Sequence, residues 1–142
     1  MKVILSVFEC NPYQGSEAGL GWSWAYSATK TKQIDELWVV TTPKNKKIDN
    51  KRDIQHFLKN EANIEWNKVH FIYVEIPLFK AKINNRIRYI LWQWKILETI
   101  HSLCANNSID YIHHATWASM TLPIFLYKEK HSRIVFGPVG GG

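Results

Sequence analysis

Short apolar runs that alternate with longer, helix-like segments are the feature that most restricts the fold of this chain. The apolar runs cover residues 3–8, 34–42, 69–76, 109–113 and 133–136. The segments between them predict helices at 16–31, 53–60, 83–105 and 114–127. Strands that alternate with helices form a parallel sheet through right-handed crossovers. The sequence therefore predicts an α/β fold, a Rossmann-like parallel sheet flanked by helices with strand order 3-2-1-4-5.

Length and composition fit one globular domain that covers residues 1–142. The formal charge of +6 permits an anionic partner, but no aromatic and basic RNA-binding motif is present, so nucleic acid is not predicted. Cys10 and Cys104 suggest neither a metal site nor a disulfide framework, and reduced thiols are expected. No stretch reads as a signal h-region or approaches the ~18 apolar residues of a membrane span. We expect a cytoplasmic protein.

A glycine-rich turn follows the first predicted strand. Three glycines, Gly15, Gly19 and Gly21, fall within seven residues, and Ser16 is the predicted N-cap of the helix that starts there. Bare backbone N–H groups at a helix N-terminus suit a phosphate or a carboxylate. The spacing matches neither the dinucleotide fingerprint nor a P-loop. The alternative is a turn that only lets the helix pack closely on the sheet.

The predicted helix at 83–105 has two faces that carry large apolar residues. One face recurs at three- and four-residue steps and comprises Ile83, Ile87, Ile90, Trp94, Leu97 and Cys104. The other mixes aromatic and basic residues, namely Tyr89, Trp92 and Ile96 with Arg86, Arg88 and Lys95. The mixed face is typical of a membrane-surface helix, or of a helix between a sheet and a neighbouring domain.

Three loops are expected at the carboxyl edge of the sheet, where open parallel sheets bind ligands. They cover residues 9–21, 113–119 and 137–142. His113 and His114 end the fourth strand and point to opposite faces, so only one faces a cleft, and the other is a core histidine. Glu9 and Glu17 are candidates for a base or a sugar-hydroxyl ligand, although a first-turn glutamate also interacts with the helix dipole. No metal-ligand spacing occurs nearby.

Three motifs, in the expected order, resemble one branch of the family-four retaining glycosyltransferases, which have the GT-B architecture. The first is Glu-Cys-Asn-Pro at 9–12 with Gly-Ser-Glu-Ala-Gly-Leu-Gly-Trp at 15–22. The second is Asp-Tyr-Ile-His-His-Ala-Thr-Trp-Ala-Ser at 110–119, and the third is Phe-Gly-Pro-Val-Gly-Gly-Gly at 136–142. Together they extend from one end of the chain to the other.

The resemblance implies the acceptor-binding N-terminal half of a two-domain hexosyltransferase, expected as a fragment or a split gene product that is inactive alone. The missing C-terminal domain would bind the nucleotide-sugar donor. The implied reaction transfers a sugar to a glycan or lipid-linked acceptor with no metal and no cofactor beyond the nucleotide-sugar co-substrate. Peripheral contact with the inner membrane face would suit such an acceptor.

By the same resemblance, the glycine loop approaches the donor diphosphate and the acceptor. The implied substrate-binding residues are Gly15, Ser16, Glu17, Gly19, Gly21, Thr116, Gly140 and Gly141. The implied catalytic residue is a histidine near the transferred sugar. The family commonly spaces two histidines by one residue, whereas His113 and His114 are adjacent. We prefer His114 for the cleft and keep His113 as the other candidate.

A non-catalytic nucleotide- or phosphate-binding α/β module is the competing hypothesis. The downstream gene discriminates between the two, because a second α/β domain with a carboxylate pair of E-x7-E type favours the transferase.

Overall fold

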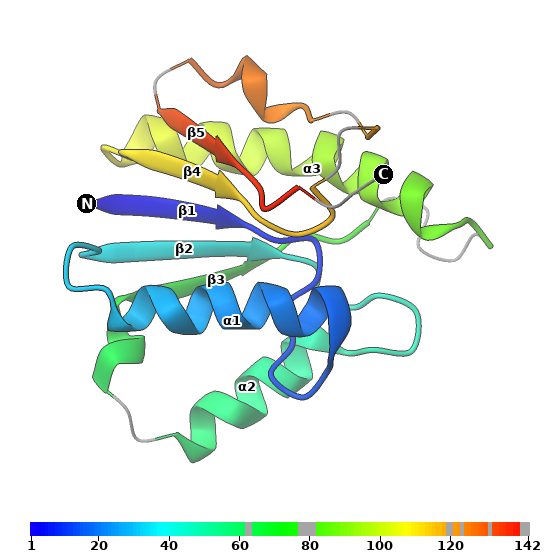
Figure 1. Ribbon diagram of the computed structural model, residues 1–142, viewed down its shortest axis with the longest axis horizontal. Helices are drawn as coiled ribbons and strands as arrows, with labels where there is room; N and C mark the ends of the chain where they lie inside the picture. The colour runs from blue at the N-terminus through cyan, green and yellow to red at the C-terminus, as the bar shows by residue number, and fades with distance from the viewer. Residues whose placement is uncertain (62–63, 77–81, 119–120, 123, 131, 140–142) are drawn as a thin grey trace.

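The computed structural model describes the chain except residues 62–63, 77–81, 119–120, 123, 131 and 140–142. Its sheet has five parallel strands in the order β3-β2-β1-β4-β5, as predicted (Figure 1). The strands are β1 (Lys2–Ser6), β2 (Glu36–Thr41), β3 (Val69–Tyr73), β4 (Tyr111–His114) and β5 (Arg133–Phe136). The helices are α1 (Ser16–Lys30), α2 (Asn50–Asn60) and α3 (Asn85–Asn106). Two 3-10 segments cover Ile64–Lys68 and Leu126–Lys128.

The helices form two layers around the sheet, with α1 and α2 on one face and α3 on the other (Figure 1). Alternate β1 side chains enter the two cores, as strand geometry requires. Val3 and Leu5 join the core that contains Trp22 of α1 and Ile54 of α2. Ile4 joins the core on the α3 side. The central strand is therefore covered on both faces, in agreement with its continuous apolar sequence.

Helix α3 is present as predicted, and its most deeply buried face differs from the face with apolar residues at three- and four-residue steps. Its buried residues are Arg88, Tyr89, Trp92, Gln93, Ile96 and Ile100. On the face with apolar residues at three- and four-residue steps, Trp94 is 64% exposed and Ile87 is 44% exposed, while Ile90, Leu97 and Cys104 are half-buried. Four residues of the mixed face, Arg88, Tyr89, Trp92 and Ile96, are buried on the sheet side, which agrees with the alternative of a helix packed on a sheet, whereas Arg86 and Lys95 are exposed. Because both faces carry apolar side chains, their period identifies a helix without identifying its inner side.

The connection between β4 and β5 differs from the predicted helix at 114–127. In the described part of this connection, the only helical segment is the short 3-10 turn Leu126–Lys128. Trp117 has a φ of +59°, which a continuous α-helix does not accommodate. Pro123 is also unfavourable inside a helix, because proline lacks the N–H that the helix needs. None of the described helices is long and apolar enough to cross a membrane.

Candidate functional site

The loops that follow β1, β4 and β5 meet at the carboxyl edge of the sheet, as predicted. Strands β1 and β4 are neighbours, and Ser6 pairs in register with His114. A cavity of about 150 Å³ lies between the three loops. Its lining comprises Glu17 and Leu20 from α1, Ala115, Trp117 and Ala118 after β4, and Pro138 and Val139 after β5. The cavity is mainly apolar and has one carboxylate in its wall.

The glycine turn packs more closely on the rest of the fold than its sequence alone required. A Cβ atom on Gly21 would lie 2.1 Å from the carbonyl oxygen of Glu9, and one on Gly19 would lie 2.5 Å from that of Gln14. Gly15 has open space where its Cβ would be. Close packing of the turn, the alternative to ligand binding, therefore explains why glycine occupies positions 19 and 21. A role for the three glycines toward a ligand stays a prediction.

The predicted capping role of Ser16 is wrong. Gly15 occupies the N-cap position without a side-chain cap, and Ser16 is the first helical residue with a φ of +53°. Both Gly15 and Ser16 are exposed to solvent. The turn stays in place through a different contact, in which the backbone N–H of Asn11 donates to the carbonyl oxygen of Ala18 over 3.0 Å.

Trp117 connects the two candidate carboxylates and was not among the predicted site residues. Its backbone N–H donates to Oε2 of Glu17 over 3.1 Å, and its indole N–H donates to Oε2 of Glu9 over 3.2 Å. Its ring stacks on Tyr89 and contacts Phe8 edge-on. A left-handed backbone costs a non-glycine residue on the order of 1–3 kcal/mol, so these contacts must hold it. In the sequence, the Thr-Trp pair of the second motif was the signal that could have pointed to Trp117.

A second set of polar contacts fixes Glu9 from the opposite side. Asn45, in the loop after β2, donates from Nδ2 to Oε1 of Glu9 over 2.6 Å. Nε of the buried Arg88 donates to Oδ1 of Asn45 over 3.0 Å. The Glu9 carboxylate thus has hydrogen bonds to both oxygens, one from Asn45 and one from Trp117. It is held in one orientation at the carboxyl edge.

His114 is completely buried, so the prediction that its ring faces a cleft is wrong for this conformation. Its Nδ1 lies 2.9 Å from Oγ of Ser6, and its Nε2 lies 2.6 Å from the hydroxyl of Tyr89. Burial lowers the pKa of His114 to about 4, and the nearby His113 adds to that effect. The imidazole is therefore neutral at neutral pH. Any effect of His114 on a ligand would pass through its neighbours.

His113 is the more accessible of the two histidines. Its Nε2 hydrogen-bonds the carbonyl oxygen of Gly137 over 2.7 Å, and Trp24 contacts the ring edge-on. A hydrogen bond to a backbone carbonyl is expected of a core histidine. His113 is nevertheless only half-buried, on the face of the sheet that α1 covers. This bond ties the end of β4 to the loop after β5.

Thr116 serves the backbone of the first loop. Its Oγ1 is buried and accepts a hydrogen bond from the N–H of Phe8 over 2.8 Å. The Thr116 hydroxyl is therefore not exposed to a substrate, contrary to its predicted substrate-binding role. Gly140 and Gly141 lie outside the described residues, and nothing structural bears on their predicted role.

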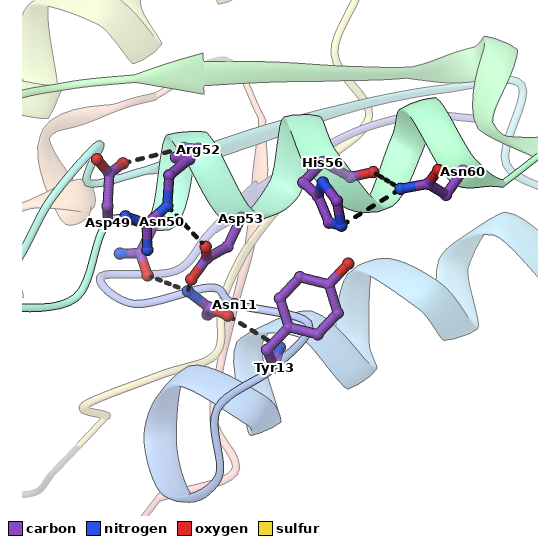
Figure 2. A network of polar contacts seen from close by, with 8 residues as sticks. All are labelled: Asn11, Tyr13, Asp49, Asn50, Arg52, Asp53, His56 and Asn60. Atoms are coloured by element: carbon purple, nitrogen blue, oxygen red, sulfur yellow. Dashed lines mark hydrogen bonds and ion pairs between the residues drawn. The ribbon is translucent and has the colours of Figure 1, made fainter.

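A polar network joins the first loop to α2 and was not predicted (Figure 2). Nδ2 of the buried Asn11 donates to Oδ1 of Asn50 over 3.1 Å and to Oδ2 of Asp53 over 2.9 Å. Its Oδ1 accepts from the N–H of Tyr13 over 2.9 Å, an Asx-turn contact. The bond from Asn11 holds the pKa of Asp53 below its usual value. The Asn-Pro pair at 11–12 was the sequence signal for this turn.

The remaining features do not add to this site. A larger cavity of about 410 Å³ lies around the end of α3 and the start of β4, where it includes Cys104, Asp110 and Ser132. No group of three His, Cys, Asp or Glu side chains that could hold a metal ion occurs in the described part of the chain.

No family model, no curated protein and no solved structure matches the chain. The protein has a Rossmann-like parallel α/β fold whose first, fourth and fifth strands lead into loops that share one cavity.

Proposed function

We propose that this chain is the acceptor-binding N-terminal half of a retaining glycosyltransferase with GT-B architecture. The observation that carries the proposal is the cavity shared by the loops after β1, β4 and β5. Each of the three sequence motifs that resemble the family contributes residues to its wall. The acceptor is a glycan or a lipid-linked glycan, and the donor is a nucleotide-sugar bound by a separate C-terminal domain.

The chemistry of the cavity supports a sugar as its occupant. The ring of Trp117 and the side chains of Leu20 and Val139 supply apolar surface, which suits the C–H face of a pyranose. The carboxylate of Glu17 can accept hydrogen bonds from sugar hydroxyls. Charge-assisted hydrogen bonds of this kind are stronger than neutral ones.

The residues around the cavity would act by position rather than by nucleophilic attack. Retaining transfer without a metal separates charge between the sugar and the departing phosphate, and fixed polar groups stabilise that separation. Trp117 sets the orientation of Glu9 and Glu17 through its two N–H groups. His114 enters this scheme as a positioning residue, because Tyr89, its hydrogen-bond partner, also stacks on Trp117.

Nuclear magnetic resonance titration of the 142-residue chain tests the proposal. The probes are methyl hexopyranosides, UDP-glucose and GDP-mannose, free UDP, and inorganic phosphate. We expect glycosides to shift the amide signals of Glu17, Leu20 and Trp117, and we expect nucleotide-sugars to bind weakly or not at all. Glu17→Gln should weaken glycoside binding on the order of tenfold, because it removes a charged acceptor. Glu75→Gln, at an exposed carboxylate after β3, is the matched control.

The competing function is a non-catalytic nucleotide- or phosphate-binding module, favoured by the exposed N-terminus of α1 at Gly15 and Ser16. Shifts at these residues with phosphate or UDP, and none with glycosides, would replace the first proposal by the second. Sugar transfer catalysed by the chain alone would contradict the half-domain proposal directly.

A further inference from the structure

A second apolar cavity lies beside α1, on the face of the sheet that α1 covers. Its volume is about 150 Å³. It shares no lining residue with the cavity of the candidate site. This α1 pocket is defined here by the side chains that form most of its wall, namely Val3, Leu5, Leu37, Trp24, Ala28 and His113.

The α1 pocket has an apolar floor and small side chains at its border. Val3 and Leu5 of β1 and Leu37 of β2 are buried and belong to the core under α1. Ser27 and Ala28, in the second half of α1, are the small residues that border it. Because neither side chain is long enough to fill the space above the strands, the helix leaves a hollow there instead of a closed core.

The α1 pocket lies next to a part of the sheet that is open to solvent. Val135 of β5 pairs in register with His113 of β4, so the two side chains lie on the same face of the sheet. Val135 is 46% exposed, and Trp24 is half-buried. The described helices therefore leave this part of the face uncovered, and a small molecule can enter from the side of β5.

The wall of the α1 pocket contains a buried donor without an acceptor. The indole N–H of Trp24 is buried and has no hydrogen-bond partner in the part of the chain that the structure describes. Buried polar groups in folded proteins nearly always have a partner, so this N–H requires an explanation. A water molecule fits poorly, because it needs several polar partners and the wall is mainly apolar. An acceptor on a largely apolar molecule fits better.

His113 provides the complementary acceptor. Its ring meets Trp24 edge-on, with the ring centres 4.6 Å apart. Its Nε2 bonds the carbonyl oxygen of Gly137, and a carbonyl oxygen only accepts, so the proton lies on Nε2. Nδ1 is then the acceptor nitrogen of the neutral ring, and none of the described residues hydrogen-bonds it. The α1 pocket therefore combines apolar surface with one free donor and one free acceptor.

We propose that the α1 pocket binds a phenol, that is, a single aromatic ring that carries one hydroxyl group. The volume suits the ring, because an apolar cavity of about 150 Å³ accepts benzene. The hydroxyl oxygen accepts a hydrogen bond from the indole N–H of Trp24, and the hydroxyl proton is donated to Nδ1 of His113. This inference goes beyond the proposed transferase function and does not depend on it.

Nuclear magnetic resonance titration of the full 142-residue chain with phenol tests the proposal. We expect the indole N–H signal of Trp24 and the amide signals of Ala28 and His113 to shift, with a dissociation constant on the order of millimolar. No glycoside or nucleotide-sugar is present, so the result is independent of any transferase function. Shifts confined to Glu17 and Leu20 would place phenol in the candidate site and overturn the inference. The absence of saturable shifts would overturn it as well.

Toluene separates hydrogen bonding from shape, because a methyl group of similar size replaces the hydroxyl. Trp24→Phe removes the donor and keeps an aromatic ring in the wall. This variant should weaken the binding of phenol roughly fivefold more than the binding of toluene. Comparing each probe with itself, in the wild type and in the variant, cancels the different hydration of the two molecules. Equal weakening of both probes would show that the N–H does not recognise the ligand and would contradict the proposal.

Two further variants locate the binding. Ala28→Leu places a larger side chain at the border of the α1 pocket and should weaken both probes roughly tenfold or more. If this variant does not fold, the comparison with Trp24→Phe still decides. Trp94→Phe is the matched control, since it is the same substitution at a 64% exposed tryptophan of α3. It should bind both probes like the wild type, and a loss equal to that of Trp24→Phe would mean non-specific binding and would refute the site.

Discussion

The hydroxyl of Tyr89 in α3 lies 2.6 Å from Nε2 of His114, the last residue of β4. On the other side of the same ring, Ser6 of β1 lies 2.9 Å from Nδ1. A helix and two neighbouring strands thus share one buried imidazole, and both of its nitrogens have partners. Because a buried polar group that loses its partner keeps the full cost of its desolvation, the three side chains should respond to mutation as one unit.

Tyr89→Phe should lower the free energy of unfolding by about 1–3 kcal/mol, because it leaves one nitrogen of His114 unpaired with little change in packing. Urea denaturation of the variant and the wild type gives this difference. Tyr13→Phe, at an exposed tyrosine, should change the stability by less than about 0.5 kcal/mol. If Tyr89→Phe is as stable as the wild type, the hydrogen bond to His114 contributes nothing to the free energy of unfolding. His114→Ala should also be destabilising, in contrast to the small effect expected of a cleft-facing histidine.

The protein should lose stability as the pH falls from 6.5 toward 4. The pKa of His114 is lowered from 6.5 to about 4 in the folded state, first by burial and then by His113. Between these values the unfolded chain binds a proton that the folded chain does not. The stabilisation is therefore complete above pH 6.5 and is lost progressively down to pH 4, by roughly 3 kcal/mol in all. Urea denaturation across this pH range measures it.

The control for this pH effect is an exposed histidine on α2. His56→Gln should leave the pH profile unchanged, whereas His114→Gln should flatten it between pH 6.5 and 4. If His114→Gln is too unstable to measure, titration of the His114 ring by nuclear magnetic resonance replaces it. A ring that titrates near 6.5 in the folded protein would disprove the assignment.

Gly21→Ala should destabilise the protein by about 1–3 kcal/mol, even though alanine is the better helix former. The new methyl group would meet the carbonyl oxygen of Glu9, which is backbone and cannot rotate away. Gly15→Ala provides the contrast, because nothing lies within 4 Å of its Cβ position, and the expected cost is only the roughly 0.5–1 kcal/mol by which alanine is a poorer N-cap than glycine. Thermal denaturation of both variants decides the matter. Similar melting temperatures would mean that the close approach at Gly21 is relaxed in solution.

Asn11→Ala should cost about 2–3 kcal/mol, because Asn50 and the N–H of Tyr13 each lose a buried or half-buried partner (Figure 2). It should also raise the pKa of Asp53, since the bond from Asn11 is the main cause of its lowering. Urea denaturation and a carboxylate titration measure the two effects. Asn60→Ala, at the exposed end of α2, should change neither. A normal Asp53 titration in the wild type would argue against this network.

The parts of the fold that follow from strand patterning were predictable. The apolar run at 133–136 coincides with β5, the alternation of strands with helices predicts the parallel sheet, and the Rossmann-like pattern predicts its strand order. The orientation of α3 was not predictable in the same way. Trp92 and Trp94 are equally apolar in sequence, and which one is buried depends on the position of the sheet, not on the period of the helix.

The candidate site was predictable as a place but not as a set of contacts. The carboxyl edge and its three loops follow from parallel topology, and the shared cavity lies there. The orientation of His114 depends on the register of β4 against β1, which places it inside beside Ser6. The role of Trp117 depends on contacts with Glu9 and Glu17, about a hundred residues earlier in the chain, which no local pattern contains.

The central place of β1 affects how this chain must fold. Strand β1 is synthesised before the other four strands, yet the bond between Ser6 and His114 spans 108 residues. Closing so large a loop costs entropy that no local contact repays, and such non-local topologies fold slowly. Until β4 has been synthesised, one long edge of β1 has no partner strand, and its apolar sequence can pair with other chains. The middle of this sheet can therefore close only after four of its five strands have been synthesised, and only the edge strand β5 remains to be added.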